Sequence, residues 1–244
     1  MPKRKPEGKF EFVKTILIAG ALALGFRSLL FEPFNIPSGS MIPTLLVGDY
    51  LFVSKYSYGY SRYSFPFGVA PIGGRIFESQ PERGDVAVFR QPKNETVAFI
   101  KRIVGLPGDR IQVTDGVLRI NDVPVIRSKK GIATATDGYN VIKFVVYEET
   151  LPNGRPYVIQ ERSDNDMLDN TSVYEVPPGH YFMMGDNRDN SRDSRSASVG
   201  MVPAENLIGR AERLFFSHNG SASLWQIWKW PFAIRYGRLG DGIM

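Results

Sequence analysis

The chain has 244 residues, of which 43% are hydrophobic, 23% charged and 12% aromatic. This composition excludes a disordered or collagen-like chain, and the length allows one large domain or two small ones. There is no cysteine, and His180 and His218 are the only two histidines. These counts exclude disulfides and thiolate nucleophiles and nearly exclude a His-rich metal site. They are consistent with our expectation that the protein needs no metal and no cofactor.

The formal net charge is +5, and much of it lies in the first fourteen residues, where five basic side chains stand against two acidic ones. A basic tail on a nearly neutral body argues against nucleic-acid binding. It suits an anionic membrane surface better. We therefore expect a lipid bilayer, and no nucleic acid, as a partner.

Residues 12–31 read FVKTILIAGALALGFRSLLF, and about 20 helical residues span the hydrocarbon core of a bilayer. We predict a transmembrane helix here, with residues 1–11 as a basic cytoplasmic tail and the body of the chain exported. Two alternatives remain open. One is a cleavable signal peptide, for which Ala21 and Ala23 are suitably small although they lie inside the apolar run. The other is a buried amphipathic helix.

After residue 32, short apolar runs alternate with Gly-, Pro- and Asp-containing turns, which is typical of antiparallel β structure. A short helix is expected only around Pro203–Leu207. The fold class is therefore mostly β, an antiparallel β body on an N-terminal transmembrane helix. The predicted strands are Tyr50–Val53, Asp85–Phe89, Val97–Val104, Val117–Ile120, Asn140–Tyr147, Tyr157–Gln160 and Tyr181–Met184.

Residues 218–244 form an aromatic C-terminal tail that contains all three tryptophans, Trp225, Trp228 and Trp230, with Phe232 beside them. Tryptophan favours the boundary between membrane and water. Two placements are open for this tail: contact with the bilayer interface, or packing on the core of the body.

Residues 36–45 read IPSGSMIPTL, so two serines flank a glycine between stiffening prolines. A hydroxyl on a rigid turn, beside a second hydroxyl that can donate a hydrogen bond, suits acyl transfer. Taken alone, the segment also fits an ordinary loop that connects a stalk to a domain.

Lys101 lies inside an apolar run, and strand alternation places Phe99, Lys101 and Ile103 on one face. If that face points inward, burial lowers the pKa of the amine towards neutrality and makes it a competent general base. If it points outward, Lys101 is an ordinary solvated lysine.

Residues 185–195 read GDNRDNSRDSR and follow a predicted apolar strand. Asp, Asn and Ser bond their own backbone in turns, and Asp–Arg pairs can brace such a loop. A solvated polar loop is the plain alternative. The three arginines oppose cation binding.

Together these segments resemble type I signal peptidases, membrane-bound Ser–Lys endopeptidases that remove signal peptides. Residues 36–45 are similar to the S-x-S-M-x-P-T-L box of that family, and residues 48–55, GDYLFVSK, to its G-D-x-x-x-V-x-K box. Residues 101–109, KRIVGLPGD, resemble its K-R-x-x-G-x-P-G-D box. Residues 185–195 resemble its G-D-N-R-D-N-S-x-D-S-R box.

The resemblance implies a role for each matching residue. Ser40 would be the nucleophile and Lys101 its general base, while Ser38 would stabilise the oxyanion together with the Ser40 N–H. Ser191 would orient the Lys101 amine. Two further residues would brace the site, Asp193 and Arg195. Four would line shallow apolar pockets for small side chains, namely Ile36, Met41, Leu45 and Phe99.

The resemblance also implies a catalytic β core of residues 32–109 and 183–217, with residues 110–182 as an inserted β region. The expected substrates are exported preproteins cut after A-x-A motifs. The expected location is the bacterial cytoplasmic membrane, which the chain crosses once, and we expect the protein to be a monomer. Some members of the family have two spans, whereas this sequence has one convincing candidate.

Two other functions are compatible with parts of the pattern. A Ser–Lys self-cleaving regulator shares the chemistry, but an N-terminal anchor stands where such a regulator has a DNA-binding domain. A membrane-tethered, non-catalytic β binding module would use the serine and arginine loops as its ligand surface. The position of Lys101 distinguishes the enzyme from the binding module: an enzyme requires Lys101 buried within reach of Ser40, whereas an exposed Lys101 far from Ser40 would favour the module.

Overall fold

The computed structural model describes residues 8–68, 70–137, 140–223 and 225–243. Antiparallel β structure dominates, which confirms the predicted fold class. The helices are α1 (Lys9–Leu29) and α2 (Trp230–Ala233). The strands are β1 (Phe31–Asn35), β2 (Asp49–Ser54), β3 (Val86–Gln91), β4 (Asn94–Gly105), β5 (Arg110–Thr114), β6 (Val117–Ile120), β7 (Val123–Pro124), β8 (Ile126–Asp137), β9 (Asn140–Thr150), β10 (Pro156–Glu161), β11 (Tyr174–Glu175), β12 (His180–Met184), β13 (Val202–Pro203) and β14 (Leu207–Ser217).

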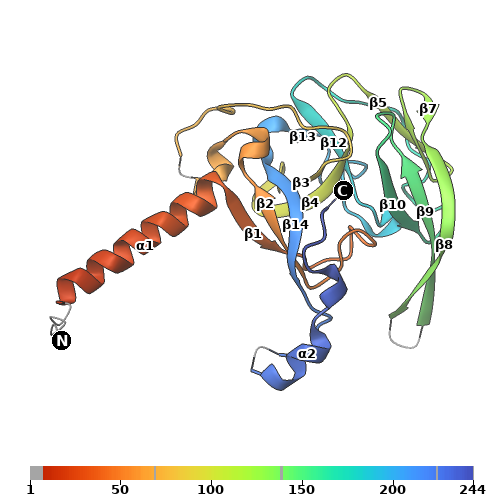
Figure 1. Ribbon diagram of the computed structural model, residues 1–244. Helices are drawn as coiled ribbons and strands as arrows, with labels where there is room; N and C mark the ends of the chain where they lie inside the picture. The colour runs from red at the N-terminus through yellow and green to blue at the C-terminus, as the bar shows by residue number, and fades with distance from the viewer. Residues whose placement is uncertain (1–7, 69, 138–139, 224, 244) are drawn as a thin grey trace.

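Helix α1 projects away from the β body, with the N terminus at its far end (Figure 1). Within the described residues, Phe10–Leu29 is the one helical stretch long and apolar enough to cross a membrane, and only 6% of it is buried. The buried-helix alternative is therefore wrong. The helix ends at Leu29 instead of residue 31 because Phe31 already belongs to the sheet. Residues 1–7 of the predicted basic tail lie outside the described residues.

The largest sheet has seven strands in the order β1-β2-β14-β3-β4-β12-β13, and all its pairs are antiparallel. Pro33 lies in β1, where the missing N–H does no harm because β1 is an edge strand. The predicted helix around Pro203–Leu207 is only a 3-10 turn, Ala204–Asn206. It leads into β14, a long strand in the interior of the sheet that pairs with β2 and β3.

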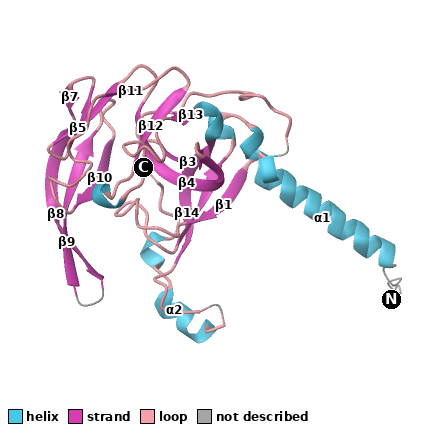
Figure 2. Cartoon of the chain, turned by 180° about the vertical axis from the view of Figure 1, so that it is seen from behind, coloured by secondary structure: helices cyan, strands magenta, loops and turns pink. Residues whose placement is uncertain are grey.

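Two smaller sheets, β10-β9-β8 and β11-β5-β6-β7, come from the chain between β4 and β12. They lie side by side with the large sheet in both views (Figures 1 and 2). Ile111 and Ile159, one from each small sheet, share one buried cluster with Val104 and Phe182 from the large sheet. The chain returns to the large sheet with β12 at His180, whereas we expected the inserted region to run to residue 182.

The C-terminal tail divides into two parts. Its end is held on the body, because Arg238 pairs with buried Asp49 at 2.6 Å and Ile243 packs against the core of the large sheet. The segment before it projects from the body around α2 (Figure 1). Trp228 and Phe232 there are 67% and 84% exposed. Core packing therefore describes only the end of the tail.

Candidate active site

Ser40 and Lys101 meet although they are 61 positions apart in the chain. Ser40 lies in the turn that follows β1, and Lys101 lies in the buried half of β4. The Lys101 Nζ is 2.6 Å from the Ser40 Oγ, and both residues are at least nine-tenths buried. An inward-facing amine within hydrogen-bond distance of a serine hydroxyl is the geometry that a nucleophile and its general base need.

The environment of Lys101 favours an uncharged amine. Burial lowers its pKa from 10.5 to about 8, although the carboxylates of Asp193 and Asp186 act in the opposite direction. The amine also lies 2.8 Å from the Ile100 carbonyl oxygen, which keeps one hydrogen bond available to it inside the protein. An appreciable share of the chains would then carry a neutral Lys101 amine near neutral pH.

An open cleft of about 750 Å³ runs beside the pair and is lined by Ser38, Ile36 and Phe99 among others. Ser38 is exposed to it. Met41 and Leu45 do not line the cleft: both are fully buried in the hydrophobic core of the large sheet, on the protein side of the Ser40 turn. The cleft is lined instead by apolar side chains that we did not predict, namely Phe34, Val88, Val97 and Ile100.

The polar loop after β12 lies next to Lys101 because β12 is the neighbour of β4 in the sheet. Ser191 lines the cleft and is 8% exposed. The expected hydrogen bond from Ser191 to Lys101 is not formed: among the described residues, the Ser191 Oγ has no hydrogen-bond partner, and the amine bonds to Ser40 and Ile100 instead.

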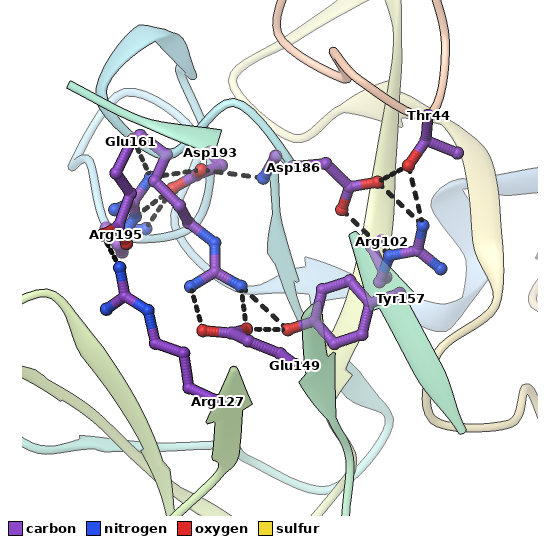
Figure 3. Close-up of polar contacts among 11 residues, drawn as sticks. Thr44, Arg102, Arg127, Glu149, Tyr157, Glu161, Asp186, Asp193 and Arg195 are labelled. Carbon is purple, nitrogen blue, oxygen red and sulfur yellow. Dashed lines mark hydrogen bonds and ion pairs between the residues drawn. The ribbon is translucent and has the colours of Figure 1, made fainter. Parts of the chain in front are cut away.

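Asp193 and Arg195 form a buried, bidentate ion pair within this loop (Figure 3). Arg195 donates from Nε at 3.0 Å and from Nη2 at 2.9 Å to the two carboxylate oxygens. Burial alone would raise the pKa of Asp193, but Arg195 and the Gly185 N–H at 3.0 Å hold that pKa below its ordinary value. The pair therefore stays charged and fixes the loop.

Comparison with known proteins identifies the family of the chain. Residues 9–216 match the family model described as signal peptidase, peptidase S26. The chain belongs to the S26 signal peptidase family. Signal peptidase I of Rickettsia typhi is 48% identical over 204 residues, which cover 80% of this chain and 76% of that protein. Signal peptidase I of Rickettsia conorii is 46% identical over 218 residues, covering 86% and 78%.

A crystal structure of a signal peptidase I from Enterococcus faecalis is also similar, with 25% identity over 54% of this chain and 97% of that one. The TM-score of 0.31 is too low for this likeness to bear on the site.

Sequence reasoning missed how the serine turn is held. Asn187 is buried, donates from Nδ2 to the Gly39 carbonyl at 2.9 Å, and donates its N–H to the Ser40 carbonyl at 3.1 Å. Thr44, at the end of the same turn, donates to Asp186 at 2.5 Å. The position of both partners in the 185–195 loop was the available signal, but nothing in the sequence shows which carbonyls they reach.

Arg102 links β4 to the polar loop after β12 in a similar way. It follows Lys101 in β4 and forms two hydrogen bonds with Asp186, of 2.9 and 2.7 Å (Figure 3). Both residues are 1% exposed. Because β-strand side chains alternate, Arg102 points to the opposite face of β4 from Lys101 and locks the loop there.

Gly185 is needed for this packing, which gives a test. A Cβ at this position would lie 2.2 Å from the Ser191 Oγ and 2.5 Å from the Ser40 carbonyl oxygen. We expect Gly185→Ala to lower peptidase turnover by ~100-fold, because a displacement of about 1 Å at the reacting groups can cost that much. Turnover is measured on full-length protein in detergent, below the melting temperature of the variant. Gly237→Ala, which meets no atom within 4 Å, is the control. Wild-type turnover in Gly185→Ala would contradict the packing argument.

Proposed function

We propose that this chain is a membrane-anchored serine endopeptidase that removes N-terminal signal peptides from exported preproteins. The observation that carries the proposal is the buried Lys101 amine 2.6 Å from the Ser40 hydroxyl. Membership of the S26 family supports it independently. The substrate class follows the relatives, which are named signal peptidase I.

In this mechanism the neutral Lys101 amine takes the proton of Ser40, and the Ser40 oxygen attacks the carbonyl carbon before the cleavage point. The tetrahedral intermediate collapses when the amide nitrogen leaves with a proton from the Lys101 ammonium. The neutral amine then removes a proton from a water molecule, which attacks the ester carbonyl. The Ser40 oxygen leaves with a proton from the Lys101 ammonium, which restores the starting pair. Burial of Lys101 supports this role because its pKa, lowered to about 8, provides both protonation states near neutral pH.

Ser38 and the Ser40 N–H are proposed to stabilise the oxyanion. Ser38 borders the cleft two residues before the nucleophile, and among the described residues no acceptor engages the Ser40 N–H. Both donors are thus available to a substrate oxygen. Removal of one such donor typically lowers turnover by ~10²–10³-fold.

Ser191 is proposed to orient the Lys101 amine once substrate is bound, because its unpartnered hydroxyl lies in the same cleft. Asp193 and Arg195 are proposed to brace the loop that carries it. Since catalytic hydrogen bonds often tighten only in the substrate complex, the absence of a Ser191 contact here is compatible with that role.

Substrate selection is proposed to come from the apolar wall of the cleft. Ile36, Phe99 and the neighbouring side chains form shallow contacts that suit Ala-like residues one and three positions before the cut, the A-x-A pattern of secretory signals. The substrate is an extended peptide that needs no cofactor.

Membrane anchoring is proposed to place this cleft on the exported side of the bacterial cytoplasmic membrane. Helix α1 supplies a single span, with its basic flank in the cytoplasm. The exposed Trp225, Trp228 and Phe232 suit the bilayer interface and would hold the body of a single chain near the surface where signal helices emerge.

A tethered, non-catalytic binding module is disfavoured by the same observation that carries the proposal. A binding module does not need a buried lysine, and burial of its ammonium group would lower the stability of the folded protein. Lys101 is only 4% exposed and points at Ser40.

Removal of either member of the pair tests the chemistry. Ser40→Ala and Lys101→Met are each expected to abolish cleavage of a purified preprotein by the full-length protein in detergent. Lys101→Met removes the cost of burying a charge, so we expect it to melt no lower than wild type at pH 7, as measured by thermal unfolding. Lys93→Met is the matched control, because Lys93 is an exposed lysine near the far end of the β3–β4 hairpin. If Ser40→Ala or Lys101→Met still cleaves the preprotein, the substituted residue is not the nucleophile or the general base.

The pH dependence of kcat/KM tests the base. Protonated Lys101 cannot accept the Ser40 proton, so activity should be low below the pKa of Lys101, rise through about pH 8 and level off above it. The measurement is initial cleavage rate between acidic and alkaline pH with a soluble signal-peptide substrate. A rise centred near the ordinary histidine value of ~6.5 would point instead to a histidine base.

A further inference from the structure

A third buried ion pair joins the polar loop to strand β9, outside the Ser40–Lys101 site. Arg188, between Asp186 and Ser191, is 1% exposed. It donates to both carboxylate oxygens of Glu149 in β9, at 3.2 and 2.5 Å, and to the Tyr157 hydroxyl in β10 at 2.8 Å. The Tyr157 hydroxyl also donates to Glu149 (Figure 3). Two strands of a small sheet therefore hold one side chain of the catalytic loop.

The backbone of Arg188 continues this contact towards the reacting groups. Its carbonyl oxygen accepts a hydrogen bond of 2.6 Å from Nη2 of Arg195, and the same nitrogen donates to Asp193. Asp193 in turn accepts the Gly185 N–H at 3.0 Å. Gly185 is the residue packed against the Ser40 carbonyl. Hydrogen bonds among buried groups thus run from Glu149 to Gly185, and Gly185 completes the connection by packing against the Ser40 turn.

The end of β10 holds the loop on both sides of Arg188. The Gln160 N–H donates to the Asp186 carbonyl at 2.9 Å, and the Arg162 N–H donates to the Asp189 carboxylate at 2.6 Å. These bonds limit how far the loop backbone can move. The Arg188 side chain itself is held by its hydrogen bonds to Glu149 and Tyr157.

The charge of Glu149 matters because neither partner reaches solvent. Glu149 is 0% exposed, and a buried arginine that loses its carboxylate partner becomes an uncompensated buried charge, which is strongly unfavourable. Arg188 would then move towards water and pull its backbone carbonyl away from Arg195. A pair buried this completely has more effect on the position of its loop than an exposed ion pair would.

We propose that Glu149 and Tyr157 are positioning residues for the peptidase reaction, acting through Arg188 to hold the 185–195 loop against Ser40 and Lys101. This inference rests on the proposed function. It gives the small β8–β10 sheet a role in turnover, although none of its residues lines the catalytic cleft among the residues described.

The experiment compares full-length variants in detergent on a signal-peptide substrate. Glu149→Gln keeps the shape of the side chain and removes its charge, and it should lower kcat by ~10–100-fold with KM within about twofold of wild type. Tyr157→Phe removes one hydroxyl and should lower kcat by a smaller factor. Glu148→Gln is the matched control: it is adjacent in β9 but pairs with exposed Lys130, and its kcat should equal that of wild type.

A double-mutant comparison separates positioning through Arg188 from general destabilisation. If Glu149 acts through Arg188, adding Glu149→Gln to Arg188→Met should change kcat by less than about twofold. Thermal unfolding of each variant ensures that turnover is measured well below melting. If Glu149→Gln does not fold, the kcat of Tyr157→Phe decides in its place.

Three results would overturn the inference. They are a wild-type kcat in both Glu149→Gln and Tyr157→Phe, a loss confined to KM or to melting temperature, and a Glu149→Gln effect that persists in full beside Arg188→Met. A wild-type chain that cleaves no signal peptide would be a different failure, because it would overturn the proposed function together with this inference.

Discussion

Burial of the Lys101 amine beside Ser40 imposes a cost on the folded protein. The pKa of Lys101 falls from 10.5 to about 8, and a shift of this size corresponds to about 3 kcal/mol. Between these two values the unfolded chain binds the proton and the folded chain does not, so the free energy of unfolding rises with pH across that window. Near neutral pH the folded protein is thus less stable than it would be with an ordinary lysine. The proposed catalysis uses that same destabilised amine.

The surrounding residues hold the buried Lys101 amine beside Ser40 despite this cost. Strand β4 is held between β3 and β12, which buries the half of the strand that carries Lys101. Asn187 fixes the Ser40 turn through two hydrogen bonds. The buried pairs Arg102–Asp186, Arg195–Asp193 and Arg188–Glu149 then brace the loop from three directions. Charged pairs buried this deeply are costly to break, which makes the loop rigid.

The polar residues of the site were predictable from the sequence because they lie in short, dense segments, whereas their contacts were not. Alternation in β4 placed Lys101 and Phe99 on one face, but only the packing of neighbouring strands decides that this face is buried. Met41 and Leu45 belong to the serine segment, yet their turn directs them into the core, because apolar side chains there can be removed from water. Glu149 lies far from every motif in the sequence. The register of β9 and β10 places Tyr157 opposite it, but its contact with Arg188 is seen only in the folded chain.

The strands that were missed have physical reasons of the same kind. β1 contains Pro33, which argues against a strand unless the strand lies at an edge. β8 is long, but its sequence IRSKKGIATATD has only two large apolar side chains, so its pairing with β9 supplies the order that its own composition does not. The helix signal around Pro203–Leu207 was local, and the non-local pairing of β14 with β2 and β3 overrides it after one turn.

The most direct test of the account is a titration of Lys101 itself, by NMR of isotope-labelled lysine in the full-length protein in detergent. The Lys101 signal is identified by its loss in Lys101→Met, and the remaining lysines report ordinary behaviour. The account predicts a midpoint at about 8 for this amine alone. A Lys101 midpoint near the ordinary lysine pKa of ~10.4 would mean that the amine is charged at neutral pH, which would contradict its role as the base.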